Sequence, residues 1–178
     1  MAAKRRLHLM NSKKRTCIMS IAATILVLTF IGMSYAQTIY NNNDALKNVA
    51  QSNVYFDVSL DDDQKILLRL EMLQRTARQL KEAGVDVSVV IGFRGGASRF
   101  VTKGDHYVLD EEIDNKKKIQ EWVSRFANDG IRIEQCSIAA ELLDIAADDF
   151  LPEITIVANG YISLIGYQTQ GYAVVPMD

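Results

Sequence analysis

The alternation of strand-like and helix-like segments is the feature that most constrains the fold of this chain. Short runs rich in apolar and β-branched residues recur at positions 54–60, 85–91, 131–135, 154–157 and 172–175. Strands separated by helices at this rhythm form βαβ units, which build a largely parallel sheet with helices on both faces. The pattern therefore predicts an α/β fold. The run at 85–91 is mostly apolar, which predicts a strand in the middle of the sheet.

The segments between these runs carry helical signals. Apolar residues recur in steps of three and four from Ile66 to Leu80, after N-cap candidates at 61–63 and before a helix-ending glycine, Gly84. A second helix is predicted over 111–127, with Gly130 just past its end. Shorter helices are predicted at 137–143 and 161–170. Residues 92–97 are expected to form a loop, and residues 102–110 favour no single structure.

The first 36 residues are of a different kind. They contain six basic residues and no acidic residue, followed by an apolar run at 17–33 and a small-residue end, Ser34-Tyr35-Ala36. This pattern is typical of a secretory signal peptide cleaved before Gln37. The alternative is an uncleaved inner-membrane anchor at 17–33, a length at the short end of what spans a bilayer. We expect a signal peptide at 1–36, a polar lead-in at 37–53, one domain at 54–178, and a periplasmic or secreted location.

Charge and cysteine content both change once residues 1–36 are set apart. The 178 residues include 20 basic and 22 acidic side chains, a net charge of −2, whereas residues 37–178 keep 14 basic and 22 acidic ones, a net charge of −8. A general nucleic-acid-binding protein needs a basic face, so we expect no nucleic-acid partner. One cysteine remains, Cys136. It is a buried hydrophobic residue, a link to another chain, or a reactive thiol.

Two features fall at carboxyl ends of predicted strands, where open parallel sheets bind ligands. Cys136 lies between a strand and a helix, and backbone N–H groups at a helix start favour a thiolate over a thiol. A packed, inert cysteine is the equally weighted alternative. The other feature is a glycine-rich segment whose N–H groups can cradle an anion, or which only reverses the chain. Its residues are Gly92, Phe93, Arg94, Gly95 and Gly96.

The remaining candidates are weaker. His106 is the only histidine after residue 36, and Asp105 and Asp110 beside it only faintly suggest a metal site. We therefore predict neither a metal nor a cofactor. Arg94 and Arg99 can hold an anion or can be solvated surface charges. The chain has no G-x-S-x-G and no C-x-x-C motif, so hydrolase and dithiol-redox functions lack support.

Several segments of the chain together carry a family resemblance. The segments are IEQCS at 133–137, DDFLP at 148–152, ITIVANG at 154–160, QTQGYA at 168–173 and, earlier, VVIG at 89–92. In this arrangement a strand ends in a cysteine, a short helix and an acidic turn follow, and the chain closes on a Q-x-x-G-Y-A segment. The sequence resembles the DsrE/DsrF-like family of sulfur-relay proteins over residues 54–175.

The resemblance implies a three-layer α/β/α sandwich with a mainly parallel sheet of about five strands. It also implies a homo-oligomer, a trimer or hexamer, and a cysteine that carries sulfur as a persulfide, here Cys136. The leading hypothesis is an exported protein that binds or transfers sulfane sulfur on Cys136, in a pocket shared with residues 93–96. Arg94 would stabilise the anionic sulfur, and a sulfur donor or acceptor protein would be its partner.

Two alternatives stay open at this point. A non-catalytic, oligomeric module of the same fold would use the cleft for a small ligand or a partner, with Cys136 only packed. The second alternative is that Cys136 acts as a redox sensor or forms an interchain disulfide. Whether the protein is an enzyme is also open, because the sequence contains no complete catalytic constellation. Membrane contact is expected only through the signal peptide or the uncleaved anchor.

Overall fold

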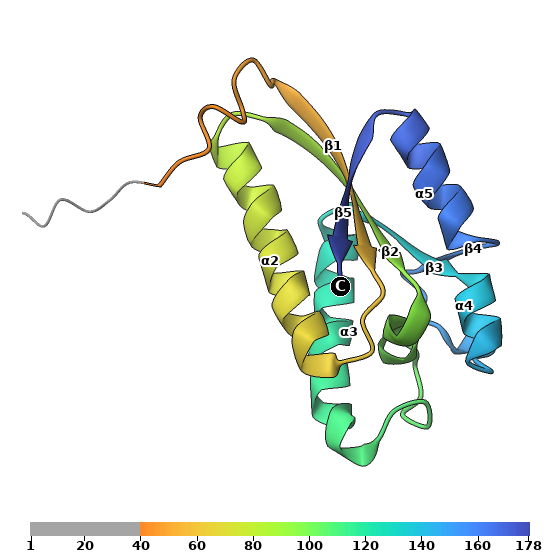
Figure 1. Ribbon diagram of the computed structural model, residues 1–178. Coiled ribbons are helices and arrows are strands. Elements are labelled where there is room, and N and C mark those ends of the chain that lie inside the picture. Colours follow the sequence, from red (N-terminus) through yellow and green to blue (C-terminus); the bar gives the residue numbers. More distant parts are fainter. Residues whose placement is uncertain (1–39) are drawn as a thin grey trace, which may run out of the picture. The chain divides into compact units, whose positions relative to one another are not determined.

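The computed structural model describes residues 40–178, of which residues 46–178 form one compact unit (Figure 1). The predicted signal peptide lies outside the described residues. Within 40–178, no helix is long and apolar enough to cross a membrane. The strands are β1 (Gln51–Val58), β2 (Asp86–Phe93), β3 (Arg132–Cys136), β4 (Thr155–Val157) and β5 (Tyr172–Met177). The α-helices are α2 (Asp63–Glu82), α3 (Ile113–Asn128), α4 (Ser137–Leu142) and α5 (Gly160–Thr169).

The five strands form one sheet in the order β4-β3-β2-β1-β5, and every neighbouring pair is parallel. This confirms the predicted α/β fold with its mainly parallel sheet, and β2 is the central strand, as its apolar content predicted. The register sets Asp57 of β1 beside Gly92 of β2, and Gly92 beside Glu134 of β3. The carboxyl ends of β1, β2 and β3 therefore meet at one edge of the sheet.

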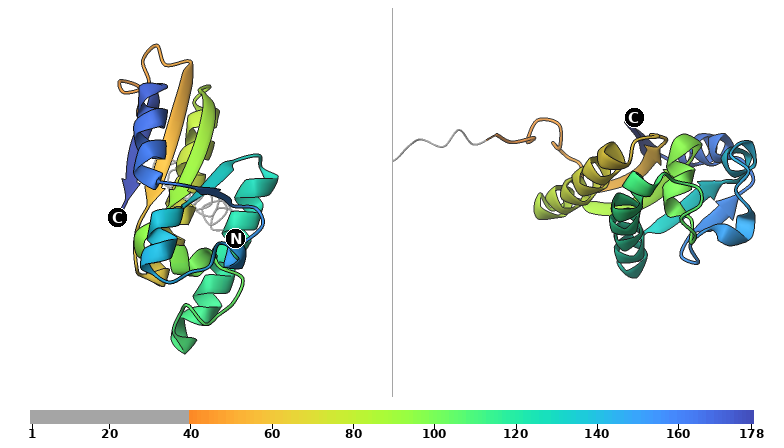
Figure 2. Two further views of the ribbon diagram at one scale, coloured as in Figure 1. Left: turned by 90° about the vertical axis from the view of Figure 1, so that its right-hand side faces the viewer. Right: turned by 90° about the horizontal axis from the view of Figure 1, so that it is seen from below.

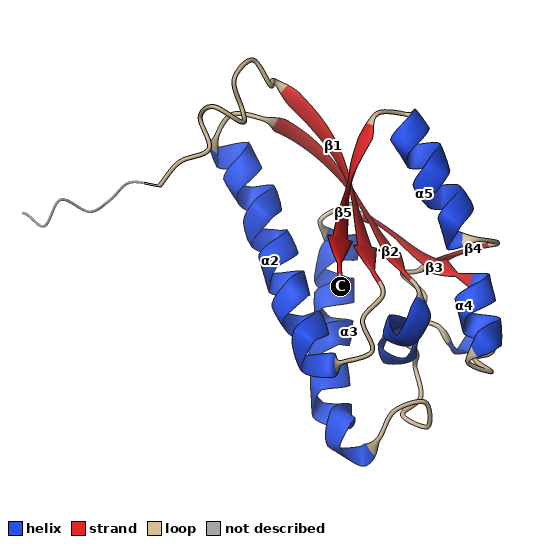
Figure 3. Ribbon diagram, in the orientation of Figure 1, coloured by secondary structure: helices blue, strands red, loops and turns tan. Residues whose placement is uncertain are grey.

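The hydrophobic core lies between the sheet and the helices α2 and α3, which pack against each other (Figure 3). Alternate residues of β1 point into it, because side chains along a strand alternate between faces. These residues are Val54, Phe56 and Val58, all buried. Fully burying such a side chain stabilises the fold by about 1.5–3 kcal/mol. The core also includes Ile66, Leu70 and Leu73 of α2 and Ile119, Val123 and Phe126 of α3.

The opposite face of the sheet is covered by α5 (Figure 2). It carries buried polar side chains, among them Asp57 and Glu134. The ring of Tyr167 on α5 lies 5.3 Å from that of Tyr55 and 4.9 Å from that of Tyr172, measured between centroids. The Tyr167 hydroxyl donates to the buried Glu134 carboxylate at 3.0 Å. Burial, followed by this hydrogen bond, raises the pKa of Tyr167. With α2 and α3 on one face and α5 on the other, the molecule is the three-layer sandwich that the family resemblance implied.

The predicted helix ends are confirmed where the cap geometry is specific. Asp62 is the N-cap of α2, and its carboxylate accepts a hydrogen bond from the Lys65 backbone N–H at 2.9 Å. Gly84 and Gly130 follow α2 and α3 with φ angles of +82° and +76°. Glycine adopts this left-handed conformation without the steric cost that other residues meet.

Several boundaries differ from the sequence prediction, and those of β1 and β2 bear on the site. β1 begins at Gln51 rather than Val54, because Gln51, Ser52 and Asn53 continue the pairing with β2. β2 continues through Gly92 and Phe93, which pair with Asp57 and Val58. The loop prediction for residues 92–97 is therefore wrong: a 3-10 helix, Gly95–Val101, begins almost where the strand ends.

The ambiguous stretch 102–110 contains little regular structure and is held by a buried lysine. Lys116 of α3 is fully buried, and its ammonium donates to the Thr102 hydroxyl at 2.9 Å and to the Gly104 carbonyl. Thr102 also forms an isolated bridge with Phe150. These contacts are distant in sequence, so periodicity within 102–110 does not reveal them.

Candidate functional site

A cavity of about 320 Å³ lies at the carboxyl ends of the strands. Cys136 contributes to it from the end of β3, and Arg94 from the end of β2. The polar part of the lining comes from the connections after β1, β2 and β4 and from the start of α5: Asp61, Arg94, Gly95, Gly96, Asn159 and Tyr161. The apolar part comes from α4 and the residue that follows it: Ile138, Ala139, Leu142 and Leu143.

Cys136 is 5% exposed, and its sulfur is held by the start of α5. The Gly160 backbone N–H donates to Cys136 Sγ at 3.2 Å. Gly160 is the first residue of α5, after the N-cap Asn159. This N–H group lies at the positive end of the α5 helix dipole. Cys136 is thus neither sealed in the core nor open on the surface: it contacts the cavity through a buried, hydrogen-bonded sulfur.

The approach of α5 to Cys136 depends on glycine at position 160. A Cβ atom on Gly160 would lie 3.1 Å from Cys136 Cβ and 3.4 Å from Sγ. The first distance is tighter than ordinary van der Waals contact, so a larger residue would move the cysteine or the helix. Glycine here brings the N–H within reach of the sulfur.

Arg94 is fixed by a buried carboxylate. Its Nε and Nη2 donate to the two oxygens of Asp57, each at 2.7 Å, a bidentate pair. The Asp57 carboxylate is largely buried, and its hydrogen bonds raise the pKa of Arg94. The Tyr161 ring centroid lies 5.0 Å from the guanidinium carbon, within the range of a cation–π contact. Arg94 therefore presents a permanent positive charge to the cavity in a defined orientation.

The glycine pair after Arg94 brings the backbone close to the loop that follows β1. Gly95 has φ +57°, and a Cβ there would lie 3.0 Å from the Ser59 carbonyl oxygen. A Cβ on Gly96 would lie 2.2 Å from that of Asp61, a clash. Both glycines were predicted pocket residues, and both line the cavity. Without side chains they let the segment after β2 pack closely against the segment after β1.

Gly92 and Phe93 do not line the cavity, which corrects the predicted pocket. Phe93 is 1% exposed and belongs to the core on the α2 and α3 side. Gly92 lies under the Tyr55 hydroxyl, which would stand 1.8 Å from a Cβ at that position. Burial raises the pKa of that hydroxyl, with Glu134 and Asp57 adding to the effect. Strand alternation turns Phe93 to the face opposite Arg94. Gly92 is on the same face as Arg94 but lies under Tyr55 and not in the cavity.

Of the weaker candidates, Arg99 and His106 do not line the cavity. Arg99 is engaged by Asp61 and by Glu112, the latter at 3.4 Å. The His106 ring packs on Tyr107, with 3.9 Å between centroids. Within the described residues, no three His, Cys, Asp or Glu side chains gather as metal ligands would.

Several site residues were missed by the sequence analysis. Asp57 pairs with Arg94, Tyr161 packs on it, and Asn159 caps the helix that contacts the sulfur. An acidic residue inside the apolar run 54–60 was the available signal for Asp57. The apolar wall of α4 carried no signal, because its side chains are typical of any buried helix face.

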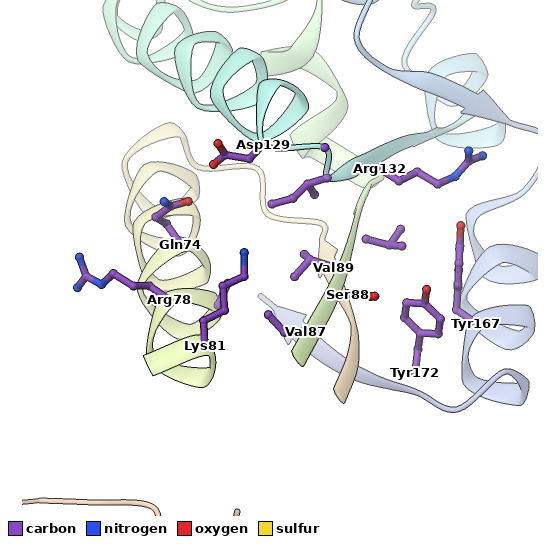
Figure 4. Close-up of a pocket in the computed structure, with 14 residues that line it drawn as sticks. Gln74, Arg78, Lys81, Val87, Ser88, Val89, Asp129, Arg132, Tyr167 and Tyr172 are labelled. Atoms are coloured by element: carbon purple, nitrogen blue, oxygen red, sulfur yellow. The ribbon is translucent and has the colours of Figure 1, made fainter. Parts of the chain in front are cut away.

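A second cavity, of about 480 Å³, lies toward the amino ends of β2 and β3 (Figure 4). It is lined by basic and aromatic side chains, among them Arg78, Lys81, Arg132, Tyr167 and Tyr172. Arg132 is already paired with Glu134 at 2.7 Å. None of the predicted site residues lies in this cavity, so the candidate site is the one at the carboxyl ends.

Fold and site together define a class: α/β/α sandwich proteins with a single cysteine at the end of a strand, in a cavity beside an arginine. The chain belongs to the DsrE/DsrF-like family, whose model matches residues 54–177.

Comparison with one solved structure supports the fold. The chain is similar to the protein of unknown function MTH1491 from Methanobacterium thermoautotrophicum, with a TM-score of 0.57 and 19% identity over 70% of this chain and 98% of that one. It is also similar to the conserved protein of unknown function BT1422 from Bacteroides thetaiotaomicron, with a TM-score of 0.45 and 15% identity over 70% and 94% of the two chains. No curated protein matches the chain.

Proposed function

We propose that this protein is an exported sulfur carrier that binds sulfane sulfur on Cys136 as a persulfide and transfers it to an acceptor. The observation that carries the proposal is the position of Cys136 Sγ, 3.2 Å from the Gly160 N–H in the cavity that Arg94 also lines. Membership of a family of sulfur-relay proteins is consistent with this chemistry.

The proposed reaction needs no external oxidant. The Cys136 thiolate attacks the outer sulfur of a persulfide R–S–SH, the donor S–S bond breaks, and RS⁻ leaves with the electron pair. The product is Cys136–S–SH, which loses a proton to become an anion. Arg94 and the Gly160 N–H supply favourable interactions for that negative charge. An acceptor thiolate then attacks the outer sulfur in the same way and regenerates Cys136.

Export and assembly are parts of the proposal that the sequence supports. Residues 1–36 have the pattern of a signal peptide, and residues 37–178 carry a net charge of −8. We propose that the mature protein acts outside the cytoplasm as a homo-oligomer, a trimer or hexamer. Exposed apolar side chains on α5 outside the cavity lining supply surface for such contacts: Ile162 and Ile165.

The test is to incubate purified residues 37–178 with inorganic polysulfide and to measure the mass of the intact protein. We expect a gain of one sulfur atom per chain that dithiothreitol reverses. Cys136→Ser should gain none, with circular dichroism showing that the variant is folded. No gain on the wild type, or an equal gain on Cys136→Ser, would leave the non-catalytic binding module as the better account.

A further inference from the structure

We propose that the Cys136 cavity selects sulfur donors whose body is apolar and uncharged, represented by an alkyl persulfide, over donors with a charged body, represented by glutathione persulfide. This inference rests on the proposed function and adds the chemical class of the donor. It is argued from the apolar side chains of α4 in the lining of the cavity.

The lining combines two chemically different groups of residues. Cys136, Arg94 and the start of α5 surround the place where the reacting sulfur atoms would lie. The apolar group comes from α4, which begins directly after Cys136 and contributes Ile138 and Leu142, followed by Leu143. Leu142 is 80% exposed, so this wall continues to the mouth of the cavity. A donor with its outer sulfur at Cys136 would place its body along this apolar wall.

The charged side chains of the lining are already paired. Arg94 binds both oxygens of Asp57, and Asp61 binds Arg99. The carboxylates and the ammonium of a charged donor body would find no side chain of opposite charge among the lining residues of α4, so they would lose part of their hydration there without a compensating contact. An alkyl body would instead gain from contact with the same wall. The net charge of −8 over residues 37–178 also opposes the approach of an anionic body.

The experiment measures how fast Cys136 of residues 37–178 gains one sulfur atom from butyl persulfide and from glutathione persulfide, at equal concentrations and pH, by intact mass. We expect the butyl donor to react faster by about tenfold or more. The charged groups of glutathione persulfide lose hydration without gaining a partner, and a penalty of about 1.4 kcal/mol corresponds to a factor of ten. Equal rates, or a faster rate with glutathione persulfide, would overturn the inference and leave the carrier function intact. No loading by either donor would overturn the carrier function itself.

A pair of variants tests whether the wall causes the preference. Leu142→Lys places a cation at the mouth of the cavity, so the ratio of the butyl rate to the glutathione rate should fall severalfold. The control is Leu68→Lys on α2, which is also exposed and does not line the cavity; its ratio should stay at the wild-type value. A general change in folding or assembly alters both rates and not their ratio. An unchanged ratio in Leu142→Lys would show that α4 does not select the donor.

Discussion

At the scale of single residues, Gly160 packs directly against Cys136 and leaves no room for a larger side chain. Gly160→Ala adds a Cβ that would lie 3.1 Å from Cys136 Cβ, so the cysteine or the start of α5 must shift by a few tenths of an ångström. We expect Cys136 to gain sulfur severalfold more slowly, because the N–H to Sγ geometry changes. The measurement is the loading rate by intact mass.

Gly166→Ala on the same helix is the matched control. A Cβ at Gly166 meets no atom within 4 Å, and alanine is the better helix former, so the free energy of unfolding should rise by about 0.5–1 kcal/mol. The loading rate should not change. Equal loading rates in the two variants would show that the contact between Gly160 and Cys136 is not functional.

Asp57 is expected to act through Arg94. Asp57→Asn replaces one acceptor of the bidentate pair with an amide and leaves Arg94 less firmly oriented. Because the bonds are charge-assisted and largely buried, the free energy of unfolding should fall by about 2 kcal/mol. Sulfur loading should slow as well, and partial recovery in Asp57→Glu would support an orienting role. A stability loss with an unchanged loading rate would make Asp57 purely structural.

The comparison of Arg94 with Phe93 shows how far the cavity-lining residues could be predicted from the sequence. The sequence placed both in one segment after a strand, and of the two only Arg94 lines the cavity. It did not show that β2 continues to Phe93, and one further residue of strand turns a side chain to the other face. The pairing of Asp57 with Arg94 depends on the register of β1 against β2, which local patterns do not encode.

At the scale of elements, the start of α2 provides a prediction about pH. The Lys65 backbone N–H donates to the Asp62 carboxylate and lowers the pKa of Asp62 below its ordinary 3.8. A carboxylate with a lowered native pKa stabilises the fold above its unfolded pKa and loses that contribution as the pH falls through the folded pKa. Asp62→Ala should therefore be less stable than the wild type at neutral pH.

The stability difference between Asp62→Ala and the wild type should shrink as the pH falls below 3.8, measured by urea unfolding at a series of pH values. A difference that stays constant down to low pH would show that the charge of the Asp62 carboxylate contributes nothing. Sulfur loading at neutral pH should be the same in both proteins, since the α2 cap is not part of the cavity lining.

The helices and strands themselves were largely predictable, because amphipathic periodicity and glycine positions are local signals. The 3-10 helix Gly95–Val101 was not, since it depends on the fit of Gly95 and Gly96 against the loop that follows β1. The stretch 102–110 was not predictable either, because Lys116 and Phe150 hold it from far along the chain.

At the scale of the whole molecule, the unpartnered side of α5 predicts self-association. Ile162 and Ile165 are 66% and 64% exposed and lie on the helix that covers the polar face of the sheet. We expect light scattering to report a trimer or hexamer, and the double change Ile162→Asp and Ile165→Asp to reduce its mass. Leu68→Asp, on α2, should leave the assembly unchanged. A monomeric wild type would contradict the proposed assembly.

The central claim is that Cys136 carries transferable sulfane sulfur, and cyanolysis measures this most directly. Cyanide attacks the outer sulfur of a persulfide and releases thiocyanate, which returns the cysteine to its thiolate. After loading with polysulfide and removal of excess donor, the wild type should release one thiocyanate per chain, and Cys136→Ser should release none. Thiocyanate absent from the wild type, or equal in both proteins, would contradict the account.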